Sequence, residues 1–160
     1  MHTSNASAFR TLLYGLDNVG NRTSGTDNGV ATNYAYDALN ELLNSQTGTA
    51  RTAWSYDAVG NRIKQTAPKG VVTDYSYDAA DRMVTAGSTT FTYDENGNRL
   101  TESGSSGTTT YAYDGRNRLL SVAAPTGISS FTYDGDGNRI SQATPSGTYD
   151  YVNDTQSLCR

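Results

Sequence analysis

One short motif recurs along almost the whole chain, and this repeat restricts the fold more than any other feature. The motif is an aromatic residue, any residue, a second aromatic or apolar residue, and then Asp. Successive Asp residues lie 20, 20, 21, 16, 20, 20 and 20 positions apart. A fixed period of this length is typical of a tandem array whose units stack on their neighbours. The copies are Tyr14–Asp17, Tyr34–Asp37, Trp54–Asp57, Tyr75–Asp78, Phe91–Asp94, Tyr111–Asp114, Phe131–Asp134 and the degraded Tyr151–Asp154.

The residues after the Asp alternate between two forms, so the full period is a pair of units of roughly 40 residues. The first form is Asp-x-x-Gly-Asn-Arg, which ends at Arg22, Arg62, Arg99 and Arg139. The second form follows Asp37, Asp78 and Asp114, and we expect it to be one residue shorter.

Each unit divides into two strands and two turns. Alternation places Tyr34 and Tyr36 on one face and Ala35 on the other. Asp-x-x-Gly predicts a tight turn closed by a left-handed glycine, with the Asp side chain bonded to the turn backbone. A second turn, such as Asn28-Gly29 or the stretches near Gly70, Gly107, Gly127 and Gly147, leads to the next unit. The predicted tight turns are Asp17–Gly20, Asp57–Gly60, Asp94–Gly97 and Asp134–Gly137.

The composition favours strands over both helix and disorder. Leu, Ile, Val and Phe together make up only 24 of 160 residues, a low share that by itself suggests disorder. The chain also has 12 Tyr and a net charge of only -4, whereas disordered chains have few aromatics and high net charge. Glycines interrupt every candidate helical stripe. The sequence therefore predicts an all-β fold of tandem antiparallel β-hairpins forming a curved, open ribbon or a segment of a β shell, with the array at 14–154 between flanks at 1–13 and 155–160.

Tyr-x-Tyr-Asp-x-x-Gly-Asn-Arg at this period resembles the YD repeat of bacterial Rhs proteins, toxin-complex C subunits and animal teneurins. The resemblance implies a hollow shell that often encloses a cytotoxic C-terminal segment, and a secreted or cell-surface location that the chain itself does not specify. Two departures suggest a short or truncated member: the chain has seven repeats, and no Asp-Pro-Gly-type cleavage segment follows Asp154. The expected partners are further YD repeats or an enclosed toxin-like domain. The signature residues, all expected to be structural, are Tyr34, Tyr36, Asp37, Trp54, Tyr56, Asp57, Gly60, Asn61, Arg62, Tyr75, Tyr77, Asp78, Phe91, Tyr93, Asp94, Gly97, Asn98, Arg99, Tyr111, Tyr113, Asp114, Phe131, Tyr133, Asp134, Gly137, Asn138 and Arg139.

Catalytic and metal chemistry find little support in the residue pattern, and we expect no enzyme activity and no cofactor. His2 and Cys159 lie at opposite ends of the chain, which rules out the usual catalytic triads and zinc sites within one chain. Asp94 and Asp134 each begin a stretch like a calcium loop, but the required Gly and closing Glu are missing. A glycosidase carboxylate pair stays a remote alternative, because nothing singles out two of the acidic residues.

The sequence argues against nucleic-acid binding and membrane spanning but leaves carbohydrate binding open. Only two Lys residues are present, so no basic patch predicts nucleic-acid binding, and no apolar run is long enough to cross a membrane. Rings such as Tyr34, Trp54 and Tyr111 could stack on sugars if they were exposed, so a carbohydrate or cell-surface binding module is the main alternative to a structural role. We expect instead that the rings hold neighbouring hairpins together.

Three structural expectations follow from the repeat. The Asp residues should cap turns while the Arg residues cover Tyr rings or form ion pairs across the hairpin. The second aromatic positions should form one packed stripe, whose register the sequence leaves open. The end strands lack evident caps, so we expect the isolated chain to associate with itself or to be only marginally stable. The stripe consists of Tyr36, Tyr56, Tyr77, Tyr93, Tyr113 and Tyr133.

Overall fold

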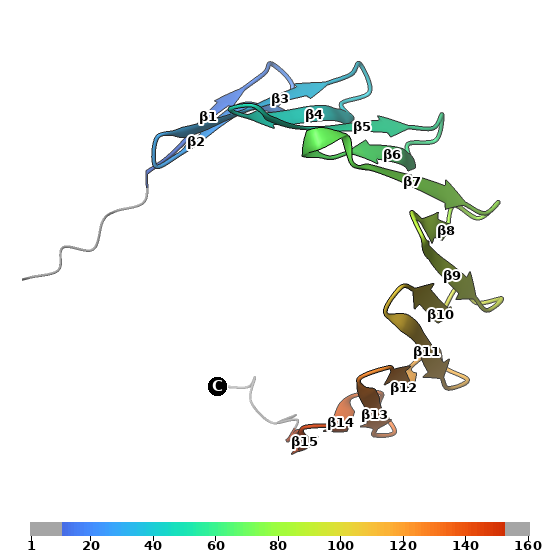
Figure 1. Ribbon diagram of the computed structural model, residues 1–160. Coiled ribbons are helices and arrows are strands. Elements are labelled where there is room, and N and C mark those ends of the chain that lie inside the picture. The colour runs from blue at the N-terminus through green and yellow to red at the C-terminus, as the bar shows by residue number, and fades with distance from the viewer. Residues whose placement is uncertain (1–10, 153–160) are drawn as a thin grey trace, which may run out of the picture. The chain divides into compact units, whose positions relative to one another are not determined.

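The computed structural model describes residues 11–152, and there the chain is built from fifteen antiparallel strands and a single 3-10 turn, η1 (Pro68–Gly70). The prediction of an all-β fold made of tandem hairpins is therefore confirmed. The chain divides into two compact units between Ser76 and Tyr77. In each unit, every strand pairs with the strand that follows it in the sequence, as Figure 1 shows.

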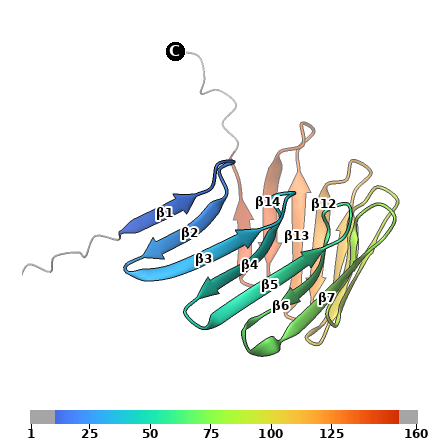
Figure 2. The ribbon, with the colours of Figure 1, turned by 90° about the horizontal axis from the view of Figure 1, so that it is seen from above.

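The first unit is a meander in which consecutive strands lie side by side (Figure 2). The turn η1 makes the connection between its last two strands. Its strands are β1 (Leu12–Leu16), β2 (Arg22–Asp27), β3 (Val30–Tyr36), β4 (Leu42–Thr47), β5 (Ala50–Tyr56), β6 (Arg62–Thr66) and β7 (Val72–Tyr77).

The second unit repeats the same meander with antiparallel pairing throughout. Its strands are β8 (Met83–Ala86), β9 (Thr89–Tyr93), β10 (Arg99–Gly104), β11 (Gly107–Tyr113), β12 (Leu119–Ala124), β13 (Gly127–Tyr133), β14 (Arg139–Thr144) and β15 (Gly147–Asp150).

The Asp turns lie where the sequence predicts them. At the first one, the Gly20 N–H donates to the Asp17 carbonyl at 3.2 Å, and the Asp17 N–H donates to the Asn21 carbonyl at 2.9 Å. Gly20 has a φ of 92°, a conformation that glycine adopts without steric cost. The same two bonds close the turns that begin at Asp57, Asp94 and Asp134, so all four predicted turns are confirmed.

The second form of the turn is not shorter than the first, and that expectation is wrong. Asn40, Asp81 and Asn117 occupy the position of the glycine, with φ values of 64°, 58° and 60°. Each donates its N–H to the carbonyl of the Asp three residues earlier. Asn and Asp are the side-chain-bearing residues that tolerate the left-handed region best, so the turn keeps its length without glycine.

A one-residue shift in strand register accompanies these turns. It lies between Gly15 and Leu16 in β1 and between Ser55 and Tyr56 in β5, for example. Such a bulge bends the strand and strengthens its twist. The return turns are more varied, but Asn28 and Gly29 adopt positive φ values of 48° and 83°, as a two-residue hairpin turn requires.

The sheet of each unit is a single layer, and none of the described residues is fully buried. The predicted alternation is present, because the motif aromatics from Tyr34 to Tyr133 are half-buried while intervening residues such as Ala35, Thr92 and Ala112 are exposed. The second-aromatic column that was expected to form a packed stripe is likewise half-buried throughout, at Tyr36, Tyr56, Tyr77, Tyr93, Tyr113 and Tyr133.

Candidate functional site

Each repeat Asp within residues 11–152 caps its own turn. In Asp94, Oδ1 accepts the backbone N–H groups of Asn96 and Asn98 at 3.0 and 2.8 Å, and Oδ2 accepts the Asn98 side-chain amide at 2.9 Å. This side-chain bond, opposed by partial desolvation and assisted by the backbone bonds, holds the pKa of Asp94 below its ordinary value. Because bonds to the ionised form stabilise it, the ionised carboxylate of Asp94 caps the turn. The turn-capping interpretation is confirmed at all seven sites, Asp17, Asp37, Asp57, Asp78, Asp94, Asp114 and Asp134.

Arginines of the second form link one turn to the next. The Arg118 Nε donates to Asp114 Oδ2 at 2.7 Å, and its Nη1 donates to the Asp134 carbonyl at 3.2 Å. The same guanidinium lies 4.8 Å from the centroid of the Tyr133 ring. Arg82 makes the matching three contacts with Asp78, the Asp94 carbonyl and Tyr93. We did not predict this linkage, although Arg four residues after the Asp in two of the three second-form turns was a visible signal.

Glu41 occupies the position of Arg82 and Arg118 in the first of the second-form turns, so a negative charge replaces the positive one. Burial, followed by the hydrogen bond to Asp37 and repulsion from Asp37 and Asp57, raises the pKa of Glu41. A like charge close by disfavours the ionised form. This turn therefore lacks the guanidinium that Arg82 and Arg118 supply elsewhere.

Arginines of the first form lie over aromatic rings. The Arg99 guanidinium lies 5.7 Å from the Phe91 centroid and 4.7 Å from the Tyr111 centroid, within the range of cation–π attraction. Arg99 also donates to the Tyr111 hydroxyl at 3.1 Å and pairs with Glu102 at 3.1 Å. The expected covering of rings by Arg is confirmed at Arg22, Arg62, Arg99 and Arg139.

The second aromatic column bonds back to the preceding hairpin. The hydroxyl of Tyr56 donates to the Leu42 carbonyl at 2.9 Å, and that of Tyr93 donates to the Met83 carbonyl at 2.8 Å. In each case the acceptor is the first residue of the preceding return strand. Desolvation raises the pKa of Tyr56 above its ordinary value; the hydroxyl of a tyrosine is in any case protonated at neutral pH. Sequence reasoning missed these bonds because they depend on the register. The same bond forms at Tyr36 and Tyr133.

The rings considered for sugar stacking are engaged within the sheet. Arg22 lies 4.5 Å from the Tyr34 centroid, and the Trp54 Nε1 donates to Gln65 Oε1 at 3.2 Å. Arg99 covers Tyr111. A sugar would have to displace these contacts to stack on a free ring face.

The residues considered for metal binding in the sequence serve other roles or lie outside the described part of the structure. Between residues 11 and 152, no three His, Cys, Asp or Glu side chains gather where they could hold a metal ion. Asp94 and Asp134, which begin the calcium-like stretches, are turn caps. His2 and Cys159 lie outside the described residues. Within the described part, no helix has the length and apolar character needed to cross a membrane.

Comparisons with known proteins agree with this architecture. A family model described as RHS Repeat matches residues 56–90, 93–128 and 113–149, which is more than half of the chain. No curated protein was found to match. Among solved structures, a Photorhabdus luminescens Tc holotoxin pore with mutated TccC3 is similar, with a TM-score of 0.65 and 20% identity over 88% of this chain and 9% of that one. The crystal structure of TcdB2-TccC3-Cdc42 gives a TM-score of 0.62 and 19% identity over 91% of this chain and 10% of that one. The chain thus spans about a tenth of the length of the proteins that it resembles in fold.

Proposed function

Because the chain belongs to the RHS repeat family, we propose that it is a structural segment of a β shell that encloses, displays or connects other domains, such as a toxin. The observation that carries the proposal is the repeated use of charged side chains to join consecutive hairpins. Arg118, for example, binds its own turn, the next turn and a ring of the next strand at once. Arg82 makes the same three contacts in the preceding second-form turn, and a linkage that repeats along the array supports a structural role.

The proposal extends to partners and location. Strand β1 pairs with β2 and strand β15 pairs with β14, so each end strand has a second edge whose N–H and C=O groups can accept another strand. Further RHS repeats of the same wall are the natural occupants of these edges. The similar structures are a Tc holotoxin pore and a TcdB2-TccC3 complex. By analogy, we propose that this chain belongs to an exported assembly and has no enzyme activity of its own.

Light scattering and amide hydrogen exchange on the 160-residue chain test the wall proposal. A wall segment with open edges should associate as its concentration rises, and the amides of β1 and β15 should exchange faster than those of central strands such as β5 and β11. A monodisperse monomer over a wide concentration range, with end strands as protected as central ones, would show a complete domain and contradict the proposal.

A glycan array distinguishes the carbohydrate alternative. The engagement of Tyr34, Trp54 and Tyr111 within the sheet disfavours it, so we expect no selective binding. Selective binding of one glycan class that is lost in Trp54→Ala and kept in Tyr149→Ala, whose side chain is exposed, would support a binding module instead.

A further inference from the structure

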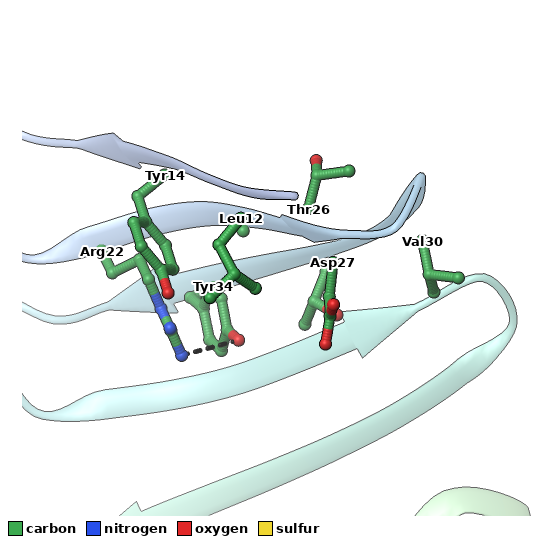
Figure 3. Close-up of a pocket in the computed structure, with 9 residues that line it drawn as sticks. Leu12, Tyr14, Arg22, Thr26, Asp27, Val30 and Tyr34 are labelled. Carbon is green, nitrogen blue, oxygen red and sulfur yellow. Dashed lines mark hydrogen bonds between the residues drawn. The ribbon is translucent and has the colours of Figure 1, made fainter. Parts of the chain in front are cut away.

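A cavity of about 270 Å³ opens on the first unit between the rings of Tyr14 and Tyr34. Figure 3 shows these rings beside Arg22 at one end of the cavity, with Asp27 and Val30 toward the other end. Gly25 also lines the cavity and lies directly across from Tyr14 in the strand register. A Cβ atom built on Gly25 would lie 3.8 Å from both rings, which is ordinary van der Waals contact, so the backbone at Gly25 leaves room for a side chain.

The corresponding position of every other first-form hairpin carries a Gln or Glu. Gln65 pairs with Trp54, Glu102 pairs with Phe91, and Gln142 pairs with Phe131, just as Gly25 pairs with Tyr14. Each of these residues stands three positions after the Arg that covers the rings. Gly25 is therefore the one first-form hairpin position of the described array where this side chain is missing.

The side-chain oxygen at this position accepts bonds from the aromatic groups around it. Gln65 Oε1 accepts the Trp54 Nε1–H at 3.2 Å, Glu102 Oε2 accepts the Tyr111 hydroxyl at 3.3 Å, and Gln142 Oε1 accepts the Tyr151 hydroxyl at 3.0 Å. The oxygen of a Gln or Glu side chain thus completes the cluster made by two rings and one Arg.

The donors of the first hairpin are in place without this acceptor. Arg22 Nη2 donates to the Tyr34 hydroxyl at 2.8 Å, as Arg99 donates to Tyr111 at 3.1 Å. Among the described residues, the Tyr34 hydroxyl has no acceptor for its own proton, and Arg22 has no carboxylate within ion-pair distance. A hydrogen-bond acceptor entering the cavity would therefore meet two oriented donors.

We propose that the Gly25 gap is a binding site for a Gln or Glu side chain from another polypeptide segment. That side chain would lie between the Tyr14 and Tyr34 rings, with its carbonyl or carboxylate oxygen accepting bonds from the Tyr34 hydroxyl and Arg22. Asp27 and Val30 line the other end of the cavity. The inference rests on the proposed role of the chain as a wall that contacts other segments.

Binding is measured by titrating the isotope-labelled 160-residue chain with glutamine or glutamate that is N-acetylated and C-methylamidated, while recording amide NMR shifts. The matching alanine derivative is the control. We expect saturable shifts around Gly25 and Thr32, with a dissociation constant on the order of millimolar for so few contacting atoms, and no saturable shifts with the alanine derivative. Equal shifts with the alanine derivative would overturn the proposal. Tighter binding of free glutamine than of its blocked form would assign the site to a small molecule and also overturn it.

Two variants place the binding at the gap. Gly25→Gln supplies the missing side chain internally, and since its Cβ meets neighbours only at 3.8 Å or more, it should fold and bind at least about tenfold more weakly. Tyr34→Phe removes one donor and should weaken binding by about fivefold to tenfold. Binding unchanged in both variants would overturn the proposal. A monomer in light scattering would remove the wall function but would leave this titration to be judged by itself.

Discussion

Replacing Tyr93 tests whether the tyrosine hydroxyls stabilise the stacking of hairpins. Tyr93→Phe removes one hydrogen bond of 2.8 Å to the Met83 carbonyl and leaves the ring in place. A neutral hydrogen bond contributes about 0.5 to 1.5 kcal/mol net. The Tyr93 side chain is only half-buried, so water can reach the abandoned carbonyl and the loss should be about 1 kcal/mol. In a unit of this size, such a loss lowers the Tm by roughly 4–8 °C.

Tyr93→Ala separates the ring from the hydroxyl. Truncating a fully buried aromatic ring costs about 3–5 kcal/mol, but Tyr93 is half-buried and also contacts the Arg82 guanidinium at 5.1 Å. We expect a total loss of about 2–3 kcal/mol, combining partial burial, the hydrogen bond and the cation–π contact.

Urea unfolding followed by circular dichroism measures both losses in free energy. The matched control is Tyr149→Phe, because the Tyr149 side chain is 54% exposed and its substitution should leave stability within about 0.5 kcal/mol. If Tyr93→Phe is as stable as the unsubstituted chain, the hydroxyl ladder has no energetic role. If Tyr93→Ala costs as much as a fully buried ring, the single-layer account of the sheet is wrong.

Three further predictions concern the Asp turns. The pKa of each of the seven described turn Asp residues is lowered from 3.8, so the stabilisation by these residues is present above about pH 4 and is lost as the pH falls through the lower folded pKa values. Thermal melts from pH 7 to pH 2 should show a nearly constant Tm that then drops, and a Tm that rises on acidification would contradict this. Glu41→Arg should raise the Tm at pH 7 by supplying the contacts that Arg118 makes in its turn. Glu41→Gln should raise the Tm less, because it removes only the repulsion between Glu41 and the neighbouring Asp residues. A lower Tm for Glu41→Arg would show that the turns are not equivalent. Gly97→Ala places a side chain at a φ of 85° and should lower the free energy of unfolding by about 1–2 kcal/mol. Gly115→Ala, with no atom within 4 Å of the new Cβ, should change it by no more than about 0.5 kcal/mol. Equal effects of the two substitutions in urea unfolding would refute the left-handed glycine argument.

The sequence was sufficient for the four turns of the first form but not for the contacts between hairpins. Asp94 and Gly97 act within a few residues of each other, so their pattern predicts the turn and its cap directly. The bond from Tyr93 to Met83 and the linkage from Arg118 to Asp134 depend on the register, which a bulge beside the Asp turn shifts by one residue, as between Arg99 and Thr101. A local pattern does not determine such a shift.

One wrong prediction has a specific physical cause. The second-form turn was expected to be shorter because no glycine follows Asp37, yet Asn40 adopts the same left-handed conformation. The degree of burial of the rings was left open by the sequence, because it depends on whether a second layer covers the sheet; each unit has one layer, and the second aromatic column stays half-buried. The gap at Gly25 was visible as a departure from Gln65 and Glu102, but only the pairing of Gly25 with Tyr14 shows what the departure leaves open.

The hydrogen bonds between hairpins span short stretches of chain, and this bears on how the protein is made. Tyr56 reaches back 14 residues to Leu42, and even the link from Asn96 to Asn117 spans only 21. Contacts of such low sequence separation close small loops and form quickly. Each hairpin therefore meets its bonding partners soon after it leaves the ribosome, and β1 to β6 can be in place before residues 77–160 have been synthesised. Growth from the first hairpin onward lets the array fold in the order in which it is translated.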